Sequence, residues 1–394
     1  MNIAIILYEP YPHGMACTTR IHNYAKGLKE IGVNLRILIP RPYENRGRYI
    51  RNDIIKGTHE GIRFEYPGGT TIKGNSFFKR RIISLKGDLN TARIIIKNRK
   101  EFDAVLMVGN FSISIIFFKI ITSSLRIKYI QEKSELPFVF YKEKNMAMNI
   151  YSYLYIKYIY KCFDGIIVIS KSLNDYFRKK IKKNAKLLLV PIIVDFDEFK
   201  EPTQVSNKNT IVYCGTLSQE KDGILTLLRS FFLIKEKYPN VKLVIVGDTK
   251  DEKDKKIVKE MINNLEIREN VILTGYVTRK QLVSYLINAR LLVLAKPSSI
   301  QSDTCFPTKL GEYLATGNPV VVTNTGEISQ YLKDMESAFL SKPNNPESIS
   351  EKLEYVLRNE QKSIEVGLRG KNVAISNFHH KKHAERIFKF ICEL

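Results

Sequence analysis

Short apolar segments alternate with helix-length segments along this chain, and that alternation constrains the fold more than any other feature. In the first half, continuous apolar runs rich in β-branched residues stand at Asn2–Leu7, Val33–Ile39, Ala104–Val108, Ile127–Gln131 and Gly165–Ile169. Such runs, separated by segments with helical spacing, are typical of a parallel sheet covered by helices on both faces. The pattern predicts an α/β, doubly wound first half.

The same pattern restarts in the second half of the chain. Strands are expected at Thr210–Tyr213, Lys242–Val246, Val271–Thr274, Leu291–Ala295 and Pro319–Thr323. A chain of 394 residues is longer than most single cores support. We therefore expect a first domain over residues 1–190, a connector over 191–206, a second domain over 207–375 and a C-terminal helix over 376–394.

Positive charge is concentrated in the first half. The net charge is +23, and residues 1–200 hold 35 Lys and Arg against 17 Asp and Glu. Such a field attracts nucleic acid, anionic lipid headgroups or a phosphorylated substrate. Basic stretches such as Lys79-Arg80-Arg81 lie next to aromatic residues such as Phe77 and Phe78. They fit either solvated helix faces or a surface that rests on an anionic membrane.

Cysteine usage and hydropathy bear on the compartment. The five cysteines are scattered, with no Cys-x-x-Cys pair, which favours a reducing environment over a disulfide framework or a zinc ribbon. The start of the sequence reads as a strand, not as a signal peptide. The apolar stretch Phe111–Leu125 is interrupted by Lys119 and is too short for a confident membrane span. We expect a cytoplasmic protein whose membrane contact, if any, is peripheral.

The segment Cys305–Val321 carries the densest signal for a ligand site. Pro307 stands where a helix would begin, so the N–H groups of Thr308 and Lys309 would be free to bind phosphate. Glu312 lies about one turn further and can accept hydrogen bonds from ribose hydroxyls. Without further support, Glu312 reads first as a helix surface residue.

A second signal follows the strand expected at Thr210–Tyr213. Gly215 permits close approach of the backbone to a ligand. Lys221 precedes Asp222-Gly223 at the N-terminal end of an expected helix, where an ammonium can neutralise a diphosphate. Taken alone, the same lysine reads as a solvated turn residue.

Together these segments resemble family 4 of the retaining glycosyltransferases, over nearly the whole chain. The resemblance also rests on Tyr11–Ala16 followed by Thr19-Arg20, on Asp164–Ser170, on Pro191–Asp195 with Phe199, and on Gly275-Tyr276-Val277. It implies the GT-B fold: two Rossmann-like domains that face a cleft, with the C-terminal helix returning to the first domain. It also implies an acceptor-binding first domain, a donor-binding second domain, and a function in bacterial surface polysaccharide synthesis.

The resemblance assigns roles to individual positions. The implied catalytic residues are Lys221, Glu312, Thr304 and Asp303. The implied donor-binding residues are Gly14, Gly215, Thr216, Lys221, Gly275, Tyr276, Val277, Phe306, Pro307, Thr308, Lys309, Leu310 and Glu312. The implied acceptor-binding residues are His13, Glu132 and Glu135.

Three departures from the family pattern affect these roles. The family has a carboxylate eight positions before Glu312, where this chain has Thr304 with Asp303 beside it. Either of these two residues, or a backbone amide, would then contact the donor sugar. Thr216 stands where many members have an arginine, which leaves the diphosphate to Lys221 and the helix terminus. Glu132 and Glu135 stand where a histidine is common.

The implied reaction is front-face displacement with retention, in which the leaving diphosphate takes the acceptor proton. It needs neither a metal nor a cofactor. The donor would be a UDP- or GDP-sugar, and the acceptor a glycan or a polyisoprenyl-diphosphate-linked sugar. Asp195-Phe196-Asp197 mimics a metal motif, but in the connector it reads as structural. His379, His380 and His383 read as a solvated helix face rather than as metal ligands.

Two other functions are compatible with part of the sequence. A nucleotide-sugar epimerase would share the nucleotide site but would need acid and base side chains that the motifs do not supply. A nucleic-acid-binding protein would explain the charge, yet no zinc finger or RNA-stacking motif is present. The sequence therefore favours the transferase and predicts no nucleic-acid partner.

Overall fold

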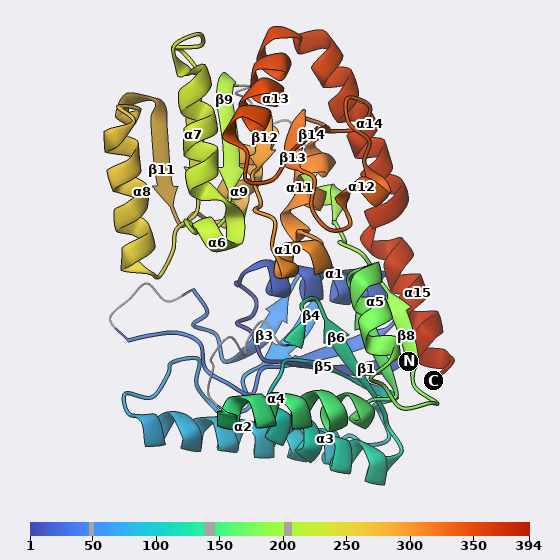
Figure 1. Ribbon diagram of the computed structural model, residues 1–394. Coiled ribbons are helices and arrows are strands. Elements are labelled where there is room, and N and C mark those ends of the chain that lie inside the picture. Colours follow the sequence, from blue (N-terminus) through green and yellow to red (C-terminus); the bar gives the residue numbers. More distant parts are fainter. Residues whose placement is uncertain (47–50, 138–145, 201–206) are drawn as a thin grey trace. The chain divides into compact units, whose positions relative to one another are not determined.

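The computed structural model describes residues 1–46, 51–137, 146–200 and 207–394 (Figure 1). The chain forms two compact units. Unit 1 comprises Met1–Ile193 together with His380–Leu394, and unit 2 comprises Val194–His379. The last part of the expected connector, residues 201–206, lies outside the described residues.

Unit 1 is built on an eight-stranded sheet in the order β3-β4-β2-β1-β5-β6-β7-β8. The strands are β1 (Asn2–Leu7), β2 (Asn34–Leu38), β3 (Lys56–His59), β4 (Ile62–Glu65), β5 (Ala104–Val108), β6 (Lys128–Lys133), β7 (Gly165–Val168) and β8 (Lys186–Leu189). All neighbouring strands are parallel except β3 and β4, which form an antiparallel hairpin at the edge. The predicted doubly wound first half is confirmed.

Helices cover both faces of the unit 1 sheet. They are α1 (Ala16–Glu30), α2 (Phe77–Lys97), α3 (Ser112–Leu125), α4 (Met146–Tyr158), α5 (Lys171–Arg178) and α15 (His380–Cys392). In Figure 1, α2, α3 and α4 lie on one face, whereas α1 and α15 pack together on the other. No helix in the described ranges combines the length and the apolar character needed to cross a membrane.

Helix α15 completes the core of unit 1, as the returning C-terminal helix was expected to do. Ala384, Ile387, Phe390 and Ile391 are buried in the same cluster as residues of α1 and β1. Gly27 on α1 allows this close packing, because a Cβ there would lie 2.8 Å from Ala384 Cβ and from the His380 carbonyl oxygen.

The expectation of a solvated histidine face on α15 was wrong. His380 and His383 are 2% and 3% exposed because they lie on the face that packs against α1. His380 Nε2 is 3.1 Å from both carboxylate oxygens of Glu30. The adjacent Lys381 and Lys382 suggested a solvent-facing side of the helix, but the two histidines lie on its buried side.

Replacement of Phe390 by alanine is expected to lower the free energy of unfolding by about 3–5 kcal/mol, since it empties a buried aromatic site. Phe390 is 5% exposed and packs over Gly165 of β7. Urea unfolding followed by circular dichroism measures the change. The neighbouring exposed Lys389 provides the control, and Lys389→Ala should stay within about 0.5 kcal/mol of wild type. Equal effects of the two changes would contradict the assigned packing.

Unit 2 has a six-stranded, wholly parallel sheet in the order β11-β10-β9-β12-β13-β14. Its strands are β9 (Asn207–Cys214), β10 (Lys242–Val246), β11 (Val271–Gly275), β12 (Ala289–Leu294), β13 (Val320–Thr323) and β14 (Phe339–Ser341). Its helices are α6 (Gln219–Asp222), α7 (Ile224–Lys235), α8 (Glu252–Asn264), α9 (Arg279–Ile287), α10 (Ile300–Thr304), α11 (Thr308–Thr316), α12 (Ile328–Tyr331), α13 (Pro346–Arg358) and α14 (Glu360–Phe378). The predicted second α/β unit is confirmed.

Candidate functional site

The topology of each sheet marks one place where a ligand is expected. In unit 2 the chain runs from β9 to β10 on one side and continues with β12 on the other side of β9. In unit 1 the corresponding reversal lies between β1 and β5. Open parallel sheets bind ligands at the carboxyl ends of the strands beside such a switch point. The predicted residues Gly215, Gly14 and His13 follow β9 and β1, at these two edges.

Three glycines line the carboxyl edge of the unit 2 sheet: Gly215 and Gly247 directly follow β9 and β10, and Gly275 is the last residue of β11. Gly215 N–H donates to the Val246 carbonyl, and Gly247 N–H donates to the Gly275 carbonyl. A Cβ on Gly247 would lie 2.1 Å from the Gly215 carbonyl oxygen, so only glycine fits there. The edge therefore presents bare backbone, to which a ligand can approach closely.

A buried carboxylate organises the loop after β9. Asp222 Oδ2 accepts hydrogen bonds from the Thr216 hydroxyl at 2.5 Å and from the Thr216 N–H at 3.2 Å, while Oδ1 accepts one from Lys309 Nζ at 2.8 Å. Burial alone would raise the pKa of Asp222, but the Lys309 ammonium and these hydrogen bonds outweigh it and hold the pKa at about 2. Asp222 thus joins the Gly215-Thr216 loop to the first turn of α11.

Helix α11 begins at this edge, where the sequence predicted it. Pro307 is the N-cap residue directly before the helix, and Thr308 and Lys309 form the first turn. The Cys214 N–H donates to the Tyr313 hydroxyl at 2.6 Å, which fixes α11 against the end of β9. N–H groups in a first helical turn have no acceptor within the helix, so those of Thr308 and Lys309 are suited to an anion.

Two predicted donor residues of this segment instead belong to the core. The ring of Phe306 is 2% exposed and stacks on Tyr331 at 5.2 Å between centroids. Leu310 is fully buried. Their side chains hold α11 in place, and only their backbone groups are left to face a ligand.

Glu312 pairs with an arginine that the sequence did not single out. Arg279 Nη1 lies 2.8 Å from Glu312 Oε1, and the same guanidinium donates to both oxygens of Glu198. Within the described residues, no donor is directed at Glu312 Oε2. Glu312 therefore has one oxygen oriented by Arg279 and a second available to a hydroxyl.

Lys221 is exposed on α6, and its ammonium has no hydrogen-bond or ion-pair partner in the described part of the chain. Its carbonyl oxygen accepts from Lys296 Nζ at 3.2 Å. Lys296 follows β12, on the other side of the switch point, and its charge also helps to lower the pKa of Asp222. Cations from α6, β12 and α11 thus converge on one sheet edge.

The remaining predicted residues of unit 2 lie on neighbouring loops. Asp303 is exposed at the end of α10, whereas the Thr304 hydroxyl donates to the Ile300 carbonyl of its own helix at 2.7 Å. Tyr276 is 43% exposed after β11, and Val277 beside it is half-buried. Of the Asp303 and Thr304 pair, Asp303 has the more accessible side chain.

In unit 1, the loop after β1 is fixed by its own contacts. His13 is exposed, and its backbone N–H donates to Asn52 Oδ1 at 2.8 Å. A Cβ on Gly14 would lie 1.9 Å from Thr18 Oγ1, whose hydroxyl donates to the Pro10 carbonyl. The glycine therefore lets the loop turn tightly into α1.

The two predicted glutamates at the end of β6, Glu132 within the strand and Glu135 just after it, differ in their surroundings. Glu132 is 5% exposed, and its Oε1 accepts from Arg20 Nε at 2.8 Å and from the Ser134 hydroxyl at 2.7 Å. This buried ion pair leaves it poorly placed to contact an acceptor. Glu135 is half-buried near Glu9: burial raises the pKa of Glu9, and the Glu135 charge raises it further.

Lys133, between these two glutamates, is a buried lysine whose Nζ donates to Asn110 Oδ1. Burial lowers its pKa to about 7. Asn110 follows β5 and Lys133 ends β6, so this contact ties together two loops at the carboxyl edge of the unit 1 sheet. A proton can therefore be gained or lost there near neutral pH.

Among the described residues, one group of side chains could hold a metal ion: His22, His59 and Glu60 of unit 1, with ligand atoms within 4.8 Å of one another. His22 Nε2 lies 3.3 Å and Lys26 Nζ 3.6 Å from Glu60 Oε2. The hydrogen bond from His22 is the main reason that the pKa of Glu60 falls to about 2. The carboxylate is thus already engaged by cationic and hydrogen-bonding neighbours.

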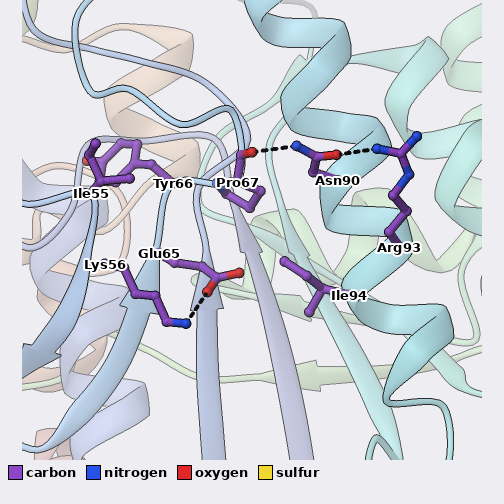
Figure 2. Close-up of a pocket in the computed structure, with 8 residues that line it drawn as sticks. All are labelled: Ile55, Lys56, Glu65, Tyr66, Pro67, Asn90, Arg93 and Ile94. Atoms are coloured by element: carbon purple, nitrogen blue, oxygen red, sulfur yellow. Dashed lines mark hydrogen bonds and ion pairs between the residues drawn. The ribbon is translucent and has the colours of Figure 1, made fainter.

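A pocket of about 350 Å³ opens elsewhere on unit 1, between the β3–β4 hairpin and α2 (Figure 2). Lys56 lies 3.8 Å from Glu65, and Asn90 bridges the Pro67 carbonyl and Arg93. None of the predicted site residues lines it. Its polar groups satisfy one another, so the pocket adds nothing to the two sheet-edge sites.

Several site residues had only weak signals in the sequence. Gly247 and Lys296 directly follow predicted strands, and Asp222 adjoins Lys221, so their positions could have been noted. Arg279 had no such signal, because its partners Glu198 and Glu312 are distant in the sequence. Its role emerges only when the chain is folded.

Solved structures of other proteins share this two-unit α/β fold over the full chain. A sucrose-phosphate synthase of Thermosynechococcus elongatus matches with a TM-score of 0.74 at 15% identity, over 100% of this chain and 98% of the other. Anabaena Alr3699/HepE, solved in complex with UDP, matches with a TM-score of 0.71 at 13% identity, over 100% of both chains. The chain has the GT-B fold. Its predicted fold class is thereby confirmed.

Sequence comparisons agree with the GT-B fold. Residues 195–373 match the model of glycosyl transferases group 1. The uncharacterized glycosyltransferase MJ1059 of Methanocaldococcus jannaschii is 31% identical over 254 residues, which cover 58% of each chain. The lipopolysaccharide 1,2-N-acetylglucosaminetransferase of Salmonella typhimurium is 25% identical over 235 residues, 56% of this chain and 60% of that protein.

This chain therefore spans about 60% of the length of these two curated relatives. The family match lies within unit 2, the unit that contains the glycine edge, α11 and Arg279. The sequence similarities are thus to glycosyltransferases, and the solved structures show the fold.

Proposed function

We propose that this protein is a retaining glycosyltransferase of family 4. It would move a sugar from a nucleoside-diphosphate sugar, UDP- or GDP-linked, to a hydroxyl of a glycan or of a lipid-linked oligosaccharide. Support comes from the Salmonella typhimurium relative, named for lipopolysaccharide, and from the UDP complex of Anabaena Alr3699/HepE. Surface polysaccharide synthesis is the proposed setting.

The observation that carries the proposal is the anion-binding character of the unit 2 sheet edge. Gly215, Gly247 and Gly275 bring bare backbone to the carboxyl edge of the sheet, and the first turn of α11 begins beside Gly215. Lys221 supplies an unpaired ammonium in the described part of this edge. A diphosphate matches this set, because helix N-termini and lysines both stabilise phosphate charge.

The nucleoside and sugar would extend from this diphosphate. Gly275, Tyr276 and Val277 would contact the base, and Glu312 would accept from ribose hydroxyls through its open Oε2. Asp303, with its exposed carboxylate, is our choice over Thr304 for the donor sugar, since the Thr304 hydroxyl already donates within α10. Thr216 and Lys309 are held by Asp222 and would position the loop against the diphosphate.

Unit 1 would bind the acceptor. His13, Gly14 and Glu135 follow β1 and β6 at its own carboxyl edge. His13 and Glu135 would orient the acceptor hydroxyl, while Glu132, paired with Arg20, would keep the β6 loop in place. In this division, Glu132 is a positioning residue.

The proposed displacement leaves the donor diphosphate to take the acceptor proton as the new glycosidic bond forms on the same face. The protein then acts by positioning both substrates and by stabilising charge on the departing diphosphate. The cations at the glycine edge supply that stabilisation, so the proposed scheme requires neither a metal nor a cofactor.

Thermal unfolding with UDP, GDP, ADP, CMP and NAD tests the donor site. One nucleoside diphosphate at about 100 times its dissociation constant is expected to stabilise the protein by about 2.7 kcal/mol. Lys221→Ala should reduce this shift strongly, whereas the exposed lysine control Lys253→Ala should keep it. A well-folded protein that responds to no nucleotide would count against the donor site.

Product analysis tests the reaction. Incubation with the identified donor sugar and a glycan acceptor should release nucleoside diphosphate and give a product with the donor's anomeric configuration, read by NMR. Inversion would overturn the retaining assignment. Conversion of the donor to its epimer without nucleotide release would instead identify the epimerase.

A further inference from the structure

The three helices on one face of unit 1 expose large apolar side chains in ordered stripes. On α2, Phe78, Ile82, Leu85 and Leu89 are 77%, 66%, 61% and 41% exposed. Their spacing of four, three and four residues places them on a single side of the helix. Gly87, Thr91 and Ile95, which are buried, mark the opposite side that packs on the unit. The outward stripe is thus not part of the core.

Helices α3 and α4 continue this apolar surface. Ile113, Ile116 and Ile120 of α3 are 84%, 47% and 64% exposed and recur at helical spacing. Tyr153 and Leu154 of α4 are 61% and 46% exposed. We call the outward surface of α2, α3 and α4 the helical face.

Side-chain contacts join the three helices into one layer, which Figure 1 shows along one side of unit 1. The Ser114 hydroxyl of α3 donates to Asp88 Oδ2 of α2 at 2.9 Å. Ser112 of α3 lies 2.9 Å from the Tyr151 hydroxyl of α4. So many large, exposed apolar side chains on one layer of helices are uncommon on a soluble monomer and mark an interaction site.

The charge on α2 indicates the kind of partner. Its 21 residues include six cations, Lys79, Arg80, Arg81, Lys86, Arg93 and Lys97, and a single acid, Asp88. Asp88 is occupied by Tyr8 and Ser114. In the described ranges, none of the six cations forms an ion pair with a carboxylate. The partner should therefore be both apolar and anionic.

We propose that the helical face docks unit 1 on an anionic lipid surface. The stripes of α2, α3 and α4 would enter the boundary between headgroups and acyl chains, and the unpaired cations of α2 would meet headgroup phosphates. A second copy of the chain fits less well, because it would place like charges opposite one another. This proposal does not depend on the proposed transfer reaction.

Vesicle flotation of the full chain tests the docking. Vesicles of phosphatidylcholine alone are compared with vesicles containing about one third phosphatidylglycerol at about 0.15 M salt. The protein is expected to float with the anionic vesicles and to stay behind with the neutral ones. Binding should weaken as salt is raised.

Two variants separate the apolar and charged contributions. Ile82→Ser with Leu85→Ser is expected to weaken binding about tenfold or more, and so is Lys86→Glu with Lys97→Glu. The matched controls lie on exposed helix surfaces of unit 2: Ile364→Ser with Leu368→Ser on α14, and Lys253→Glu with Lys259→Glu on α8. The controls should bind as wild type does. All variants should keep the wild-type melting temperature.

Three outcomes would overturn the proposal. One is a folded wild-type protein that floats with neither vesicle. Another is an equal loss of binding in the unit 2 controls. The third is a concentration-dependent dimer, seen by light scattering, in a protein that does not bind vesicles. If Ile82→Ser with Leu85→Ser dissociated that dimer, the helical face would cover a second copy of the chain.

Discussion

Replacement of Glu312 by glutamine is expected to lower kcat/KM for sugar transfer by about 100- to 1,000-fold. In the proposed function, Glu312 Oε2 accepts a donor hydroxyl while Arg279 orients the carboxylate through Oε1 at 2.8 Å. Glutamine keeps the shape but replaces one acceptor with a donor. The loss should appear in steady-state kinetics with the nucleotide sugar.

Glu198→Gln is the matched control, because Glu198 binds the same guanidinium from the other side. If Glu312 acts only by holding Arg279, the two variants should lose similar activity. If it contacts the donor, Glu198→Gln should fall by less than about tenfold, in the range of one weakened surface pair. Similar losses would therefore reject direct contact between Glu312 and the donor.

Replacement of Asp222 by alanine is expected to destabilise the protein by about 3–5 kcal/mol. The carboxylate is 7% exposed and is bonded to Lys309 and to both polar groups of Thr216. Its removal leaves the Lys309 ammonium without its partner and frees the loop after β9. Urea unfolding gives the change, and alanine at the exposed neighbour Glu220 should cost less than about 0.5 kcal/mol.

The pH dependence of stability offers an independent check on Asp222. Its pKa is lowered in the folded protein from 3.8 to about 2, so the group stabilises the fold above its unfolded pKa. The contribution, about 2 kcal/mol, should be lost as pH falls from about 4 to 2. Wild type should therefore lose more stability than Asp222→Ala over that interval. Parallel curves would show that the native pKa is not depressed.

The sequence predicted those features that depend on local patterns. Strand β1 spans Asn2–Leu7 and β10 spans Lys242–Val246, as expected from their apolar runs, and α11 begins directly after Pro307. The β3–β4 hairpin was missed, because β3 has no buried residue and exposed Arg63 interrupts β4, so neither short strand has a continuous apolar run.

The candidate site was only partly predictable for a different reason. Glycines after strands and the start of α11 have local signals, and the structure places them along one edge. The pairs Arg279–Glu312 and Lys309–Asp222 join residues 33 and 87 positions apart, so no local pattern indicates them. The sequence correctly placed Glu132 at the carboxyl end of a strand, but only the fold shows that Arg20 is its buried partner.

The return of α15 to unit 1 has a consequence for the order of events during synthesis. The chain leaves unit 1 at Ile193 and re-enters it at His380, with all of unit 2 translated between. A ribosome that has finished the first 193 residues holds an N-terminal unit whose α1 still exposes the apolar surface meant for Ala384, Ile387 and Phe390. Domains commonly fold as they emerge. Unit 2 can therefore finish folding before unit 1 does, although most of unit 1 is synthesised first.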